Sequence, residues 1–463
     1  MLDVRLIREN PDTVRDSLRR RSDSTSLALI DDVLRLDGHR RDSQSKADDL
    51  RAQLNTASKT FGSFKGHAAQ GGLDPSDVLE DAGAMGLLTV RGNHNSASLA
   101  QRTTAELLEL LQSALRELSD TADDAVGEVS ATDRSLNEKL MEFPNLPLPS
   151  APVGDSESDN VEVRQWGEIP LFDGFEPKPH WDLAPDLGIL DFDRGTRISG
   201  SRFYVLRGRG ARLQRSLISW MLSVHTAEHG YTELYLPALV TEETLRASGQ
   251  LPKFADNLYR DTEDDLWLVP TAEVPLTSMH RGEILEAAQL PLRYAAYTPC
   301  FRREKMSAGR DVRGIKRGHQ FDKVEMYKFV EPETSIDELE TMTADAEDLL
   351  QRLGLTYRVV ELCTGDLGSA AAKTYDIEVW APGCQEWLEV SSCSTTEDYQ
   401  ARRADIRYRP EPGARPQFVH TLNGSGLALP RVLIALLETY QQPDGSVTIP
   451  EALHAFTGFD RLE

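Results

Sequence analysis

Hydrophobic positions near the N-terminus recur with the spacing of a helix. Two segments carry apolar residues three and four positions apart, as in the a/d seam of a coiled coil. They are Ala47, Leu50, Leu54, Ala57, Phe61 and Phe64, and then Leu108, Leu111, Leu115, Leu118, Ala122, Ala125 and Val129. The segment 62–98 between them is rich in Gly, Asn and Ser, which favours a break. We predict an antiparallel pair of helices within a helical arm, residues 1–135. By pattern alone, such a pair fits a dimerisation coiled coil or a packing stalk.

Prolines mark the next boundary. Pro144, Pro147, Pro149 and Pro152 lie within a dozen residues and enforce an extended backbone. The polar run 155–160 continues this stretch. We therefore predict a Pro-rich linker over residues 136–165, followed by a second domain over residues 166–463.

The second domain alternates between strand-like and helical patterns. Period-2 runs occupy 202–206, 266–270, 293–299, 322–329, 356–361, 375–380 and 387–393, and helical runs occupy 211–229, 335–353 and 427–441. Many of the strands follow one another as hairpins rather than in βαβ units. This order predicts an α+β fold, an antiparallel sheet with flanking helices.

Composition narrows the class of protein. The chain has 463 residues, with 51 Lys and Arg against 75 Asp and Glu, a net charge of −24. A chain this acidic is poorly suited to diffuse nucleic-acid binding, so any RNA contact needs local basic patches. The four cysteines form no CxxC pair, which favours free thiols over a metal site. The N-terminus has no apolar leader and no membrane-length apolar run occurs, so we expect a cytoplasmic protein without a membrane partner.

The richest chemistry lies in residues 298–329. An alternating run is followed by a loop with several arginines, and a second alternating run begins at Phe321. Guanidinium groups pair with phosphate oxygens in bidentate fashion, so this loop suits a triphosphate, and a neighbouring aromatic ring can carry a base. The chain has no GxxxxGK[ST] motif, so a nucleotide site here would not be a P-loop.

Residues 298–329 resemble motif 2 of the class II aminoacyl-tRNA synthetases, and of the seryl-tRNA synthetases in particular. Further segments resemble that family in the same order: 249–254, 268–277, 363–368, 387–393 and 423–431, with the opening residues 1–11. The resemblance implies a class II antiparallel sheet preceded by a two-helix, tRNA-binding arm. It also implies a homodimer, with Pro237 at the interface. The implied reaction is activation of L-serine with ATP and Mg²⁺, then transfer to the 3′ end of tRNA(Ser).

The resemblance also assigns nucleotide-binding residues. It places Arg302 on the α-phosphate and the serine carboxylate, Glu304 on adenine, and Arg317 on the terminal phosphates. Phe321 would stack on adenine, and Arg431 would clamp the nucleotide from the opposite face. Glu389 and Ser392 would bind Mg²⁺, and the cofactor-binding set also includes Arg303, Val390 and Ser391. Because a carboxylate nucleophile is already ionised at pH 7, such a site needs positioning and charge neutralisation rather than a general base.

For the amino acid, the resemblance implies a loop formed by Thr271, Ala272 and Glu273. Glu325 would take the ammonium group, and Asn423 and Ser425 would lie nearest the hydroxyl. A pocket that hydrogen-bonds a small hydroxyl rejects alanine, because its polar groups would otherwise stay buried and unpaired.

Some departures from the family pattern leave alternatives open. The arm is acidic, with Arg40, Arg41, Lys46, Arg51, Lys59 and Lys65 as the candidates for tRNA contact, and Lys305-Met306 replaces a pair of small residues. These features suggest a specialised second copy, for antibiotic resistance or biosynthesis. A ligase that loads serine onto a carrier protein is a second reading, although its relatives lack the arm. A non-catalytic paralogue is a third, although Arg302, Glu304, Glu325 and Arg431 are all present.

Overall fold

The computed structural model describes residues 1–72, 74–84, 99, 101–305 and 313–463. The chain divides into two compact units, one made of residues 28–140 and the other of residues 1–27 together with 141–463. The arm predicted over 1–135 therefore differs from the compact helical unit at both ends. Met306 and residues 85–98 of the predicted connector lie outside the described residues.

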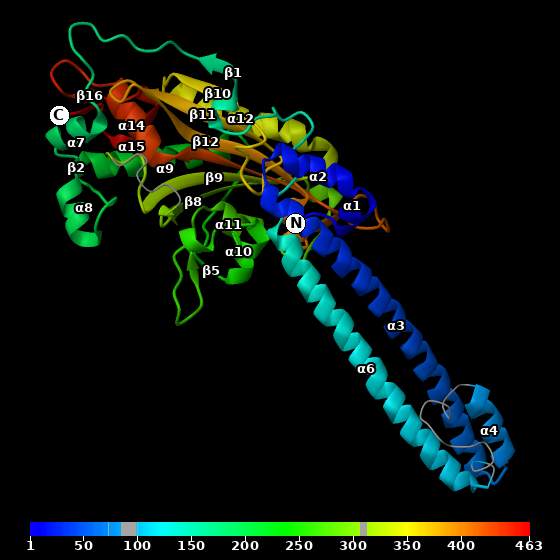
Figure 1. Ribbon diagram of the computed structural model, residues 1–463. Helices are drawn as coiled ribbons and strands as arrows, with labels where there is room; N and C mark the ends of the chain where they lie inside the picture. The colour runs from blue at the N-terminus through cyan, green and yellow to red at the C-terminus, as the bar shows by residue number, and fades with distance from the viewer. Residues whose placement is uncertain (73, 85–98, 100, 306–312) are drawn as a thin grey trace. The chain divides into compact units, whose positions relative to one another are not determined.

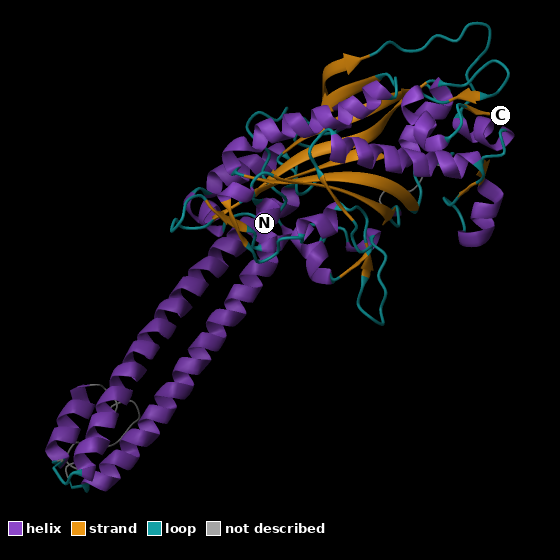
Figure 2. Cartoon of the chain, turned by 180° about the vertical axis from the view of Figure 1, so that it is seen from behind, coloured by secondary structure: helices purple, strands orange, loops and turns teal. Residues whose placement is uncertain are grey.

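The unit 28–140 is a helical hairpin. Its long helices α3 (Ser24–Ala69) and α6 (Thr104–Glu142) run side by side in opposite directions, with the short helix α4 (Pro75–Ala84) between them in sequence (Figure 1, Figure 2). The predicted seams meet in the interior, which confirms the antiparallel pair. The buried residues there are Ala57, Phe64, Val78, Leu99, Leu107, Leu111 and Leu115 in one cluster, and Ala47, Ala125 and Val129 in another.

Helix α3 ends inside the stretch 62–98, where the sequence predicts a break. It runs through Gly62 and Gly66 to Ala69, and the chain turns only at Gly71, whose φ is +74°. A glycine inside a helix costs about 1 kcal/mol relative to alanine. Burial of Phe64 against α6 offsets this cost, so the seam decides the length of the helix.

The second unit is built on an eight-stranded sheet. All neighbouring strands are antiparallel except β4 and β8, which are parallel. The strand order is β1 (Val161–Trp166), β10 (Tyr357–Glu361), β11 (Lys373–Ala381), β12 (Glu386–Glu397), β15 (His420–Ala428), β9 (Gln320–Val330), β8 (Leu292–Phe301) and β4 (Thr232–Leu234). This topology confirms the predicted α+β class.

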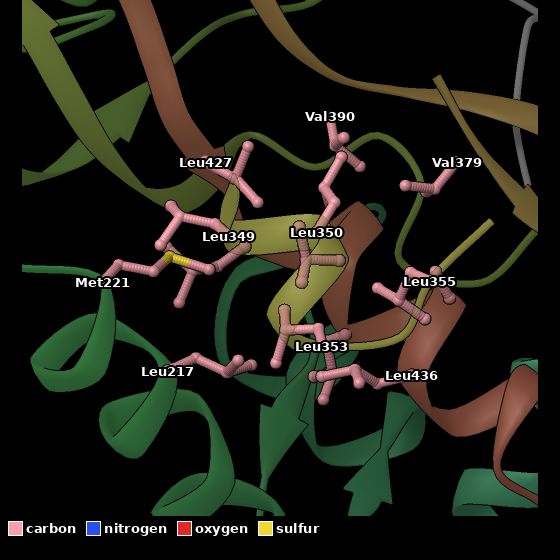
Figure 3. Close-up of a cluster of buried hydrophobic side chains, with 14 of the residues drawn as sticks. Leu217, Met221, Leu349, Leu350, Leu353, Leu355, Val379, Val390, Leu427 and Leu436 are labelled. Atoms are coloured by element: carbon pink, nitrogen blue, oxygen red, sulfur yellow. The ribbon is translucent and has the colours of Figure 1, made fainter. Parts of the chain in front are cut away.

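Three helices cover one face of this sheet: α9 (Arg209–Ala227), α12 (Ser335–Arg352) and α14 (Leu429–Thr439). They form the main core, a cluster in which Met221, Leu350 and Leu436 of the helices lie together with Val379 and Val390 of the strands (Figure 3). The opposite face carries α10 (Glu242–Ser248), α11 (Glu273–Thr277) and α13 (Tyr399–Ala404) over a second, smaller cluster. Since successive strand residues point to opposite faces, Met326 lies in the first cluster and Tyr327 in the second.

Short elements complete this unit. The helices are α1 (Val4–Glu9), α2 (Pro11–Arg20), α7 (His180–Asp186), α8 (Phe192–Ser199) and α15 (Glu451–Thr457). The small sheets pair β2 (Leu190–Asp191) with β3 (Val205–Leu206), β5 (Leu239–Val240) with β6 (Trp267–Leu268), β16 (Val447–Thr448) with β17 (Arg461–Leu462), and β13 (Arg407–Arg409) with β14 (Gln417–Phe418) and β7 (Ile284–Glu286). In the described part of the chain, no helix has the length and apolar character needed to cross a membrane.

The buried guanidinium of Arg21 explains why residues 1–27 belong to this unit. It donates to the backbone carbonyl oxygens of Asn145, Leu367, Gly368 and Ala371 at 2.7–3.0 Å. Charge-assisted hydrogen bonds of this kind are stronger than neutral ones. The N-terminal helices are therefore fixed to the loop 367–371 and to the start of the Pro-rich segment.

Strand β15 lies in the middle of the sheet, between β12 and β9, yet it was not predicted as a strand. Gly424 and Gly426 weaken its strand pattern, because glycine has low β-propensity. Packing requires both glycines. A Cβ at Gly424 would lie 2.8 Å from Met342 Sδ, and one at Gly426 would lie 2.3 Å from His225 Nε2.

Candidate active site

Two adjoining cavities, of about 320 and 480 Å³, lie on the sheet face that carries α10 and α11. They share the residues Gln250, Glu273, Arg302, Glu304, Arg317 and Asn423. The cavity of about 320 Å³, called the first cavity from here on, is lined by most of the residues singled out from the sequence. These are Thr271, Glu273, Arg302, Glu304, Arg317, Phe321, Glu325, Glu389, Ser392, Asn423, Ser425 and Arg431.

Strand β9 supplies the centre of the first cavity. Phe321, Lys323 and Glu325 alternate along it and line the cavity, whereas Val324 and Met326 point into the core. This is the period-2 pattern expected of a strand with two covered faces. It brings an aromatic ring, a cation and a carboxylate into one row.

Strand β12 adds Glu389 and Ser392 through a β-bulge. The spacing of three between them would place their side chains on opposite faces of a regular strand. The pairing register shifts here, since Ile377 pairs with Ser391 and the next residue, Glu378, pairs with Glu389. The extra residue, Val390, points into the core, so Glu389 and Ser392 both line the cavity.

Arginines surround one end of the first cavity. The Arg302 guanidinium lies 5.0 Å from the centre of the Phe321 ring, and its Nε donates to the Pro270 carbonyl oxygen at 3.2 Å. Arg317 Nη1 donates to Glu304 Oε2 at 3.1 Å. Arg431 Nη1 donates to the backbone oxygen of Glu389 at 2.7 Å. The result is a cationic rim around an aromatic floor, an arrangement that suits a nucleotide with several phosphates.

Carboxylates occupy the other end of the first cavity. Thr271 Oγ1 donates to Glu325 Oε2 at 2.6 Å, and Lys323 forms an ion pair with the same buried carboxylate. Glu273 accepts a hydrogen bond of 2.7 Å from Gln400 Nε2. Burial and the nearby Glu325 carboxylate raise the pKa of Glu273 to about 7. This end of the cavity presents negative and polar groups suited to a small cationic or hydroxylated ligand.

Four of the predicted residues do not line the cavities with their side chains. Ala272 belongs to the buried cluster beneath α10 and α11, and Val390 belongs to the main core. The Ser391 hydroxyl donates to the Ser425 backbone oxygen at 2.6 Å. Arg303 turns away, since its Nε donates to the Leu258 carbonyl oxygen at 2.7 Å. These four residues lie in the predicted segments, but their side chains pack in the core or bond to the backbone instead of lining a cavity.

Other residues line the first cavity without having been predicted. They include Lys323, Lys316 and Gln250. Lys323 could have been found, because it lies between Phe321 and Glu325 on the same face of an alternating strand. Lys316 and Gln250 lie in loops, where no periodicity shows which way a side chain points.

The donor set beside Ser392 fits a divalent cation. Asp376 lies opposite Ser392 in the pairing of β11 with β12, and Asp376 Oδ1 is buried without a hydrogen-bond partner among the described residues. Burial, with a contribution from Glu389, holds the pKa of Asp376 well above its usual range. A hard cation prefers oxygen ligands such as these carboxylates and the Ser392 hydroxyl, and its charge would compensate the buried carboxylate.

The chain is similar in sequence to known proteins of one family. The family model for the seryl-tRNA synthetase N-terminal domain matches residues 1–80, and that for the tRNA synthetase class II core domain (G, H, P, S and T) matches residues 254–440. The serine–tRNA ligase of Roseiflexus sp. (strain RS-1) is 56% identical over 458 residues, which cover 99% of this chain and 98% of that protein. That of Thermomicrobium roseum is 54% identical over 99% of this chain and 94% of its own length.

Solved structures similar to this chain come from the same family. Seryl-tRNA synthetase from Pyrococcus horikoshii, complexed with ATP, superposes with a TM-score of 0.85 at 35% identity, covering 100% of this chain and 99% of that one. The cytoplasmic serine–tRNA ligase of Naegleria fowleri, in complex with AMP, gives 0.80 at 28% identity, with coverage of 100% and 99%. The chain therefore belongs to the seryl-tRNA synthetase family, the ATP-dependent class II ligases that join serine to tRNA.

Proposed function

We propose that this ligase forms seryl-adenylate in the first cavity, with the residues lining it in the roles that the family resemblance implies. The observation that carries the proposal is the placement of two pairs in one cavity. Arg302 with Phe321 forms a site for phosphate and base, and Thr271 with Glu325 forms a site for an amino acid. The serine carboxylate would therefore meet the α-phosphate close to Arg302.

The nucleotide would occupy the cationic end. Adenine would stack on Phe321 and meet Glu304, and Arg317 would reach the terminal phosphates. Arg317 now bonds to Glu304, so ATP binding would exchange this ion pair for contacts of each partner with the nucleotide. Arg431, at the N-terminal end of α14, would close the site from the other side.

The chemistry needs placement and charge rather than proton abstraction. A serine carboxylate oxygen attacks the α-phosphorus, a new P–O bond forms, and the bond to pyrophosphate breaks. Negative charge gathers on the phosphate oxygens in the transition state. Fixed guanidinium groups stabilise that charge without having to reorganise, and binding both reactants in one cavity removes most of the entropic cost of their encounter.

We propose that Mg²⁺ binds at Glu389 and Ser392, next to Asp376. When bound, the ion would neutralise phosphate charge and orient the leaving group. Arg431 bonds to both the backbone oxygen and the carboxylate of Glu389, at 2.7 and 3.2 Å. Arg431 therefore fixes the orientation of the proposed metal ligand.

Serine would bind at the carboxylate end. Glu325 would accept the ammonium group, while Glu273, Asn423 and Ser425 would surround the hydroxyl. Because Gln400 Oε1 accepts hydrogen bonds of 2.8 Å from both Tyr327 and Thr421, the Gln400 amide nitrogen is left to hold Glu273. This buried network fixes the Glu273 carboxylate in place before serine arrives.

We propose that the hairpin of residues 28–140 contacts tRNA(Ser). Among the candidate cations, Arg40 and Arg41 pair with the buried Asp37, which reduces their availability for phosphate. Lys46, Arg51, Lys59 and Lys65 lie on exposed positions of α3. These four residues are the better candidates for contact with the tRNA backbone.

We also propose a homodimer formed around β4. Tyr235 is 100% exposed and Leu239 is 50% exposed, on either side of Pro237. Exposed apolar groups gathered at one place mark an interaction surface. The cytoplasmic location stays a prediction.

Serine-dependent ATP–pyrophosphate exchange, followed by charging of tRNA(Ser), tests the proposal. Exchange and charging together support it. Exchange without charging would point to another acceptor, as in a carrier-loading ligase, which the matching N-terminal domain does not favour. Absence of serine-dependent exchange would overturn the assigned roles. Comparison of inhibitor sensitivity with a housekeeping enzyme tests the hypothesis of a specialised second copy.

A further inference from the structure

A buried cluster lies next to the proposed nucleotide site, outside the residues assigned above. Glu438 of α14 and His180 at the start of α7 are both fully buried, and Cys384 lies beside them. Glu438 Oε1 accepts hydrogen bonds from the backbone N–H and the Nδ1–H of His180, both at 2.8 Å. Cys384 donates its backbone N–H and its thiol to the same carboxylate, each at 3.0 Å.

The far side of the His180 ring contacts the arginine-rich loop. The backbone N–H of Ile315 donates to His180 Nε2 at 3.1 Å. A backbone N–H can only donate, so Nε2 must be the acceptor and Nδ1 must carry the proton. The tautomer of the imidazole is thereby fixed, and it links an ionised carboxylate to the loop. Although burial opposes it, the hydrogen bonds from His180 and Cys384 hold the pKa of Glu438 below its usual range.

The loop backbone is fitted against the imidazole ring. Gly314 has a φ of +73°, and a Cβ at this position would lie only 1.9 Å from His180 Nε2. A side chain here would displace the ring and strain the backbone. The contact between the loop and the ring therefore depends on both the His180 imidazole and the absence of a side chain at Gly314.

The segment that His180 holds is the one that lines the nucleotide cavity. Ile315, Lys316 and Arg317 all line it. Arg431 Nε donates to the Lys316 carbonyl oxygen at 3.4 Å. Helix α14 thus holds this segment at two points, directly through Arg431 and indirectly from Glu438 through His180.

We propose that His180 and Glu438 are positioning residues for ATP, which hold Ile315 so that Lys316 and Arg317 face the phosphates. This inference rests on the nucleotide role proposed for Arg317. A metal ion is not needed to explain the cluster, because the hydrogen bonds above already pair its side chains. His180 does not touch the reacting atoms, and its effect would pass through the loop backbone.

Two substitutions in the full-length protein test separately the hydrogen bonds on the two sides of the His180 ring. His180→Asn keeps an amide donor near Nδ1 for Glu438 but removes the acceptor for Ile315. His180→Gln places a carbonyl acceptor near the Nε2 position instead. An unpaired buried N–H is costly, so we expect His180→Asn to raise the KM for ATP in pyrophosphate exchange about tenfold. His180→Gln should recover most of that loss, and the KM for serine should change little in both variants.

His229→Asn is the matched control. His229 also bonds to a carboxylate on a neighbouring helix, with 2.9 Å between Nε2 and Asp348 Oδ2, but it has no hydrogen bond to the described loop residues 313–317. Its substitution should leave the KM for ATP unchanged. If His180→Asn lowers the Tm without a larger change in the KM for ATP than His229→Asn, the cluster is merely structural and the inference is wrong.

A double-mutant cycle with Arg317→Ala tests whether His180 acts on ATP binding through Arg317. If His180 acts through Arg317, the KM effect of His180→Asn should largely disappear in the Arg317→Ala background. Full additivity would overturn the inference. If Arg317→Ala alone leaves the KM for ATP unchanged, the proposed nucleotide role fails instead, and this outcome is distinct from a failure of the His180 contact.

Discussion

The Thr271 hydroxyl donates to the Glu325 carboxylate at 2.6 Å, across 54 residues of sequence. The bond joins the loop before α11 to the middle of β9, and Lys323 neutralises the same carboxylate. Glu325 is thus fixed in one orientation at the end of the cavity that we assign to serine. The first prediction concerns this pair.

Glu325→Gln should abolish the charge that would receive the serine ammonium group. Loss of a buried charge-assisted contact predicts an increase of about 100-fold in the KM for serine in pyrophosphate exchange. The KM for ATP should change by less than about threefold. Glu361→Gln is the control, because Glu361 pairs with Lys373 on the same sheet without lining the cavities. Equal effects of both variants on serine binding would contradict the assignment.

Arg302→Lys should retain the charge but lose the planar fork that would hold a phosphate and a carboxylate together. We expect kcat of exchange to fall about 100-fold, because lysine acts as a point charge. The adjacent Arg303→Lys provides a matched control, since Arg303 faces the Leu258 carbonyl instead. The idea fails if Arg302→Lys is fully active or if the two variants are equally impaired.

Glu389→Gln should weaken the proposed magnesium site. The Mg²⁺ concentration for half-maximal exchange should rise about tenfold, because an amide is a poorer ligand than a carboxylate for a hard cation. Glu378→Gln is the control. It removes a charge from the position opposite Glu389 on β11, where Glu378 bonds to Arg358. An unchanged Mg²⁺ requirement in Glu389→Gln would argue against this residue as a ligand.

The raised pKa of Glu273 predicts a pH-dependent stability. An unfolded glutamate titrates near 4.5, whereas the folded group titrates at about 7. The folded state therefore binds more protons between these values, and the free energy of unfolding should fall as pH rises through them. The wild type should lose roughly 2.5 kcal/mol between pH 5 and pH 8 relative to Glu273→Gln.

Urea unfolding of the wild type and Glu273→Gln at several pH values measures this difference. Glu411→Gln, at an exposed position, should follow the wild type. A wild type and a Glu273→Gln variant with parallel pH profiles would show that the carboxylate has an ordinary pKa.

Reversal of charge on α3 should impair charging of tRNA(Ser) without affecting formation of the adenylate. Arg51→Glu with Lys59→Glu should raise the KM for tRNA(Ser) at least tenfold at low salt, because phosphate contacts dominate such binding. Exchange should be unaffected, since it needs no tRNA. Arg415→Glu, on an exposed loop of the other unit, is the control. Normal charging by the double variant would exclude these cations as tRNA contacts.

The sequence was informative where one physical rule governed a whole segment. The alternation in β8 and β9 predicted both strands, and the heptad seams predicted α3 and α6. Strand β15 was missed because packing against Met342 and His225 selects its glycines, and that constraint lies in distant segments. The stretch 62–98 was predicted to contain the end of α3, but the exact end at Ala69 depends on tertiary burial of Phe64, which outweighs the local glycine propensity.

The site was predictable at the level of segments, and less so at the level of side chains. The resemblance found the segment 389–392, but only the register shift shows that Val390 faces the core and Glu389 the cavity. Lys316 and the His180–Glu438 pair were not predicted as site residues. The hydrogen bonds that hold Lys316 and its neighbour Ile315 in place come from Arg431 and His180, which lie more than a hundred residues away in the sequence.

The bulge at Val390 means that β12 can tolerate a change of residue more easily than a change of length. Another apolar side chain of similar size at 390 would still fill the core. Deletion of one residue there would restore regular alternation and turn either Glu389 or Ser392 inward. We therefore expect selection on this strand to preserve the number of residues as well as their type. Length variation among relatives should accordingly avoid residues 389–392 and fall in the connecting loops.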